Sequence, residues 1–127
     1  VNGVEIHCAQ AAWDADIILP VNRVKAHTGI KGRLESGISK MLAIGLGKLK
    51  GAECYHSPES DVPIAQAIRT GGQWLIDQGK IPGGLALVEN AYHDTAMIRA
   101  VPRDTFFETE ESLLIRSKEL LAKLPIP

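Results

Sequence analysis

Ile17, Ile18 and Leu19 form a continuous apolar run that ends at Pro20. Such a run is typical of a strand that is covered on both faces, so we predict a buried strand from Asp16 to Val21. Helical patterns precede and follow it, the first being a brief helix over Cys8 to Ala15. This alternation of helices and strands predicts an α/β fold.

A helical pattern follows a loop that contains Gly29 and Gly32. Ser36 can cap this helix, whose first apolar residue is followed by others three, four and eight positions later. They are Ile38, Met41, Leu42 and Leu46. Lys40 lies off this apolar stripe, as is usual for an exposed helical lysine.

The next helix is predicted to begin at Asp61 as N-cap, with Pro63 in its first turn. Its apolar face carries Ile64, Ile68 and Leu75. Two β-patterned runs follow, "LALVEN" and "TAMIRAV", and the short connection "AYHD" between them indicates a hairpin.

A last amphipathic helix is predicted to open at Thr109 and to be closed by Pro125. Together the patterns predict a mixed, mostly parallel sheet that is flanked by helices and contains one antiparallel hairpin. We expect residues 1–127 to form one domain, or part of one, of a longer protein, because the chain begins at Val1 without Met.

Composition excludes several classes of protein. The formal net charge of −1 gives no overall attraction to nucleic acid, and no apolar run has the length of a membrane span. Cys8 and Cys54 are too few for a disulfide framework and form no C-x-x-C pair, so a reducing, cytoplasmic location is expected.

The glycine-containing loop before the predicted helix is a candidate anion site. The first turn of a helix leaves N–H groups unpaired, and Lys31 and Arg33 add positive charge. A phosphate suits such a place. A solvated basic loop with no ligand explains the same residues equally well.

Histidines are the other candidates, because imidazole exchanges protons near neutral pH and binds transition metals. His27 follows the predicted buried strand, and His56 follows a second glycine-rich segment. We expect His7 and His93 to be structural or neutral, as we do Cys8 and Cys54.

Four features together resemble the nickel-dependent lactate racemase family: His27, the segment "ESGISK" that ends at Lys40, the segment "IGLGKLKGA", and His56. In that family a histidine follows its lysine by sixteen residues, as His56 follows Lys40 here. The family's turn is usually "SGGRK", so Ser39 stands where an arginine is usual.

The resemblance implies a nickel pincer nucleotide as cofactor. Lys40 would be its covalent attachment point, His56 the protein ligand to nickel, and His27 one of two acid/base histidines. The cationic glycine loop would hold the phosphate of the nucleotide. The implied cofactor-binding residues are Lys31, Gly32, Arg33, Ser36, Gly37 and Lys40.

The implied activity is that of an isomerase, a racemase or epimerase that acts on a small 2-hydroxy acid. A histidine takes the hydroxyl proton while the cofactor takes the hydride, which leaves a planar keto acid. The second acid/base residue and a second domain would come from the rest of the chain, so these residues alone are expected to be inactive. Cofactor-synthesis proteins are implied as partners. The alternative is a non-catalytic anion- or nucleotide-binding domain without the metal chemistry.

Overall fold

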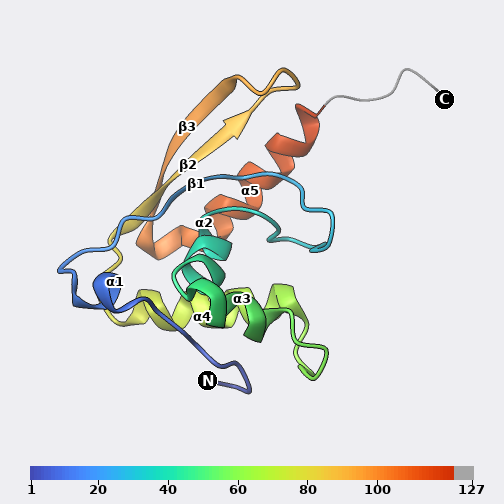
Figure 1. Cartoon of the computed structure of the whole chain (residues 1–127). Coiled ribbons are helices and arrows are strands. Elements are labelled where there is room, and N and C mark those ends of the chain that lie inside the picture. Colours follow the sequence, from blue (N-terminus) through green and yellow to red (C-terminus); the bar gives the residue numbers. More distant parts are fainter. Residues whose placement is uncertain (122–127) are drawn as a thin grey trace.

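A computed structural model describes residues 1–121 (Figure 1). Its elements are α1 (Gln10–Asp14), β1 (Val21–Arg23), α2 (Ile38–Lys40), η1 (Met41–Gly45), α3 (Lys48–Tyr55), α4 (Ile64–Asp77), β2 (Gly83–Glu89), β3 (Thr95–Pro102), η2 (Arg103–Thr105) and α5 (Phe106–Glu119). Of the two η elements, η1 is a π-helical turn and η2 a 3-10 turn.

The strands form one sheet in the order β1-β2-β3. β1 runs parallel to β2, with Val21 beside Leu85. β2 and β3 form the antiparallel hairpin, with Gly83 opposite Pro102. The α/β class, the flanking helices and the hairpin are confirmed. The sheet is not mostly parallel, because it contains one parallel and one antiparallel pair.

The predicted buried strand from Asp16 to Val21 is wrong in both extent and burial. Regular pairing begins only at Val21, and the side chains of Ile17 and Leu19 are 65% and 57% exposed. Ile18 N–H still donates to the Lys80 carbonyl at 2.8 Å, so the segment is held beside the sheet without being part of it. β1 is an edge strand, which leaves the outer side of this segment uncovered.

The helix predicted after Ser36 is present as α2 and η1, which are contiguous, and α3 follows it after Leu46 and Gly47. Gly37, not Ser36, precedes α2, and no side chain of its own caps it. In η1 the N–H of Leu46 donates to the Met41 carbonyl at 3.0 Å, a π-type bond that follows Lys40 directly. A Cβ at Gly51 would lie 2.9 Å from the Ile44 carbonyl oxygen, so α3 can fold against η1 only with glycine there.

The later helices are confirmed, with shifted starts. α4 begins at Ile64, so Pro63 lies just before the helix and Asp61 does not cap it. α5 begins at Phe106, three residues before the predicted Thr109. The predicted stop at Pro125 lies outside the described residues.

Two apolar clusters hold these elements. The first joins β2, β3 and α5 to α2 and η1 and includes Ile38, Leu42, Val88, Val101 and Phe106. The second joins η1, α3 and α4 to the loop before α2 and includes Ile30, Ile44, Tyr55 and Ile68. Each fully buried Val, Leu, Ile or Phe side chain among them contributes roughly 1.5–3 kcal/mol. α2 and η1 therefore lie between two packed layers, which fixes the backbone of Lys40 (Figure 1).

Candidate functional site

The loop between β1 and α2 is closed at its base and organised by one buried carboxylate. Lys25 and Ser36 form an antiparallel bridge at the base. Inside the loop, Glu35 accepts the backbone N–H groups of His27 at 2.8 Å and Gly32 at 3.3 Å. Hydrogen bonds within the loop therefore fix the backbone around His27.

Glu35 is also tied to α5. Its side chain is only 1% exposed, and its Oε1 lies 2.6 Å from Lys118 Nζ. Burial alone would raise the pKa of Glu35, but the hydrogen bonds from Lys118, His27 and Gly32 together lower it below its ordinary value. The carboxylate is thus charged at neutral pH and fixes the loop to the helix behind it.

The imidazole of His27 has a defined tautomer. Its Nδ1 accepts the N–H groups of Gly29 at 2.9 Å and Ile30 at 3.0 Å. A nitrogen that accepts two backbone bonds cannot carry a proton, so the proton of the neutral ring is on Nε2.

The pKa of His27 is lowered by its surroundings. Desolvation is the largest cause, and the positive charge of Lys40 follows it. His56 and Lys31 act in the same direction, while the Glu35 carboxylate opposes them. His27 is therefore neutral at physiological pH.

Lys40 and His56 lie close enough to His27 for their charges to act on its ring. Lys40 ends α2, and His56 is the residue that caps the C-terminus of α3. Within residues 1–121, the ammonium of Lys40 and the imidazole of His56 make no hydrogen bond or ion pair. Lys40 and His56 thus influence the His27 ring from two separate elements, without a bond to it.

The start of α2, in contrast, is already occupied. The buried carboxylate of Glu110 on α5 accepts the N–H of Ser39 at 3.2 Å and also its hydroxyl group. A Cβ at Gly37 would collide with this carboxylate. Burial raises the pKa of Glu110, against the bonds from Ser39, which lower it. A phosphate near Ser36 and Gly37 would therefore have to use donors other than the Ser39 amide.

The remaining loop residues of the predicted site lie at the surface. Lys31, Gly32 and Arg33 are exposed. Arg33 is 3.5 Å from the Glu111 carboxylate, in a contact that leaves the arginine side chain 87% exposed. The Gly32 N–H is used by Glu35. The Gly32 amide is therefore not available to an anion, and the positive charge offered here comes from the two side chains.

Sequence reasoning missed a second group of polar residues, made by Glu5, His7 and Cys54. One ligand atom of each lies within 4.8 Å of the other two. Glu5 and His7 are two positions apart in an extended segment, which puts them on one side of the chain and was a usable signal. Cys54 comes from α3, and nothing in its neighbourhood of the sequence points to the other two.

In comparisons with protein-family models, curated proteins and solved structures, nothing matches the chain. Among the helices of residues 1–121, none combines the length and the apolar character needed to cross a membrane.

Proposed function

We propose that this chain is the cofactor-binding part of a cytoplasmic 2-hydroxy-acid racemase or epimerase of the lactate racemase type. One observation carries the proposal. Lys40 and His56 come from different helices, yet both lie within electrostatic reach of His27 on the loop before α2. Each of these residues has a role in the family that the sequence resembles, and their charge interactions with His27 are what support the proposal.

The residues are compatible with a nickel pincer nucleotide. His56 offers an exposed imidazole, a ligand type that nickel accepts. The amine of Lys40 could form the covalent link once it is deprotonated. Lys31 and Arg33 could face the phosphate as point charges. When bound, such a group supplies a site that accepts and returns a hydride.

The observed geometry defines what His27 can do for a substrate. With Nδ1 bound to the Gly29 and Ile30 amides, the ring presents Nε2–H as a hydrogen-bond donor. It can thereby orient the hydroxyl or carboxylate oxygen of a 2-hydroxy acid. For Nε2 to take the hydroxyl proton, the ring must first release its bonds to these two amides.

The π-helical turn after Lys40 supports a functional role for this part of the chain. Single π turns within helices are frequent at functional sites, where they displace the register of neighbouring side chains. Here the turn covers Met41–Gly45, directly after the proposed attachment residue. The two apolar clusters hold it in place, so Lys40 projects from a rigid base.

The test is intact-mass and nickel analysis of the full-length protein, produced together with its cofactor-synthesis proteins. We expect a covalent adduct on Lys40, about one nickel per chain, and racemisation of a 2-hydroxy acid. Lys40→Ala should abolish the adduct, and His56→Ala should remove the nickel. Lys50→Ala, an exposed lysine on α3, is the matched control and should retain both.

Two results would overturn the proposal. One is wild-type protein that carries neither adduct nor nickel under these conditions. The other is binding of phosphate ligands without metal, weakened by Lys31→Ala and Arg33→Ala but not by Lys40→Ala, which would support the non-catalytic anion-binding alternative.

A further inference from the structure

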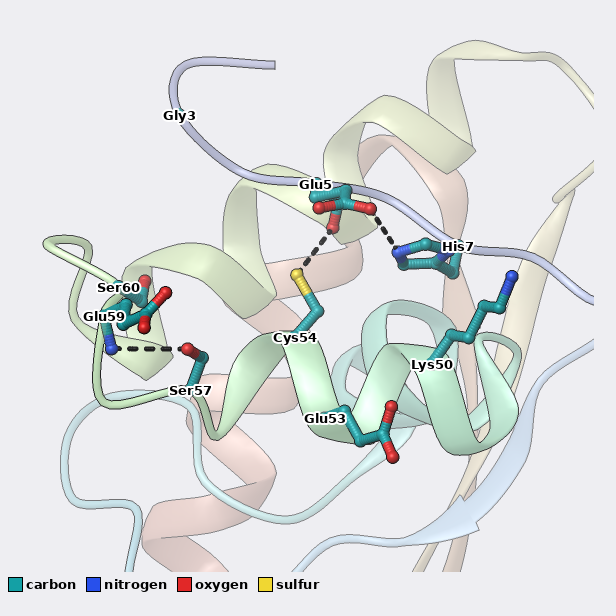
Figure 2. Close-up of a pocket in the computed structure, with 9 residues that line it drawn as sticks. All are labelled: Gly3, Glu5, His7, Lys50, Glu53, Cys54, Ser57, Glu59 and Ser60. Carbon is teal, nitrogen blue, oxygen red and sulfur yellow. Dashed lines mark hydrogen bonds and ion pairs between the residues drawn. The ribbon is translucent and has the colours of Figure 1, made fainter.

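We propose that Glu5, His7 and Cys54 form a Zn²⁺ site that fastens the N-terminal segment to α3 and leaves one coordination position open to a cavity. This site is separate from the proposed racemase centre and does not depend on it. Figure 2 shows the three side chains turned toward one another, two from the N-terminal segment and one from α3.

The distances place the three donors near a common centre. His7 Nε2 lies 2.8 Å from Glu5 Oε1. The Cys54 thiol donates to the backbone carbonyl of Glu5 at 3.7 Å. Tetrahedral zinc, with bonds of about 2.0–2.3 Å, needs donor separations of about 3.5 Å. Since the present separations do not exceed 4.8 Å, small side-chain rotations would close the site.

The donor set selects the metal. A thiolate, an imidazole and a carboxylate are all common zinc ligands, whereas Mg²⁺ and Ca²⁺ prefer oxygen donors alone. Cys54 and His7 are partly exposed, and the Glu5 side chain is 72% exposed, so a metal ion can reach all three. Binding would displace the proton of the Cys54 thiol into solvent, leaving a thiolate on the metal.

The cavity beside these donors has a volume of about 520 Å³. Its further lining is polar and includes Lys50, Glu53, Ser57 and Glu59. Zinc sites that small molecules can reach have three protein ligands, and a water occupies the fourth position. The cavity gives that water room.

A metal at this place would also hold the N-terminal segment against α3. Before α1, the chain forms no strand and is held by side-chain packing and single bonds. Val4, Ile6 and Cys8 pack on the apolar clusters, the Cys54 thiol bonds to the Glu5 carbonyl, and the Ala9 N–H donates to the Leu46 carbonyl at 2.6 Å. A metal that joins residues 5 and 7 to residue 54 would cross-link this segment to α3. Zinc should therefore stabilise the folded state by an amount that grows with the logarithm of the Zn²⁺ concentration.

The test is a titration of the full-length protein with Zn²⁺ by calorimetry and with Co²⁺ as a spectroscopic substitute. We expect each chain to bind one Zn²⁺ at this site and, with Co²⁺, to show a thiolate-to-metal charge-transfer absorption. Cys54→Ser should abolish this absorption. His7→Ala should weaken Zn²⁺ binding by on the order of 100-fold or more. Circular dichroism of each variant checks that the fold is retained.

The chain offers a matched control for the thiol. Cys8 is a second, partly buried cysteine, and its Sγ contacts its neighbour Ala9 instead of the cluster. Cys8→Ser should leave both the absorption and the affinity unchanged. Equal binding by Cys54→Ser, or loss of the signal in Cys8→Ser, would overturn the assignment.

Repeating the titration in His56→Ala separates this site from the proposed nickel centre. We expect the charge-transfer absorption to persist there, while nickel loading is lost. Loss of the cobalt signal in His56→Ala would show that the metal binds at the other centre and would refute the present proposal. Absence of nickel in the wild type would refute the racemase proposal alone.

Discussion

The two polar regions of this molecule differ in the burial of their carboxylates. Around α2, Glu35 and Glu110 are buried and each accepts several hydrogen bonds. Around the cavity on α3, Glu5 and His7 pair at the surface. The first region uses its carboxylates to build the fold. In both regions, the groups left for a ligand are those that the fold does not need: Lys40 and His56 in one, and the Glu5, His7 and Cys54 cluster in the other.

The largest difference between the regions should be in stability. Glu110→Ala should lower the free energy of unfolding by about 3 kcal/mol, because it leaves the Ser39 amide and hydroxyl buried without partners. Glu5→Ala, in the exposed region, should change it by less than about 0.5 kcal/mol. Urea unfolding of both variants makes the comparison. Similar losses for the two would contradict the assignment of Glu110 as a structural carboxylate.

The bond from Glu110 to Ser39 also shows where sequence reasoning stops. A cap for the helix was sought in its own neighbourhood, at Ser36, but the carboxylate comes from 71 residues further along the chain. The Glu5 and Cys54 contact likewise joins residues 49 positions apart. Local patterns carry no information about such pairs, so both the true cap and the second polar cluster were missed.

Where local pattern and tertiary environment agree, the sequence was sufficient. The apolar face of Ile64, Ile68 and Leu75 predicted α4, and alternation predicted the hairpin of β2 and β3. The apolar run at residues 17–19 led to the wrong prediction of a buried strand. The run lies outside the edge of the sheet, where no helix covers Ile17 and Leu19. That His27, Lys40 and His56 share one site is a prediction from the resemblance, and composition or periodicity alone would not have supplied it.

An intermediate effect is expected from the carboxylate that holds the His27 loop. Glu35→Gln should cost about 1–2 kcal/mol at pH 7, since it weakens the charged hydrogen bonds with Lys118 and His27. The folded-state pKa of Glu35 is lowered, so its contribution is present above its ordinary pKa of 4.5 and is lost as pH falls through the folded value.

Unfolding of wild type and Glu35→Gln across this pH range measures the effect. The difference between the two should shrink as the pH is lowered below 4.5. A difference that stays constant down to the most acidic condition would show that the charge of Glu35 is not what stabilises the loop. Glu53→Gln, on the exposed side of α3, is the control and should show no such trend.

The smallest expected effect is the one that tests the candidate site most directly. In protein prepared without cofactor, NMR titration should give His27 a pKa below its ordinary value of 6.5. Its unfolded form would take up a proton first, so this residue makes stability fall as the pH drops below 6.5. Lys40→Ala should raise the pKa of His27, because it removes a nearby positive charge. Lys50→Ala, which changes a lysine at the other region, should leave it unchanged. If Lys40→Ala and Lys50→Ala gave the same value as the wild type, Lys40 would not lie close enough to His27 to share a ligand with it.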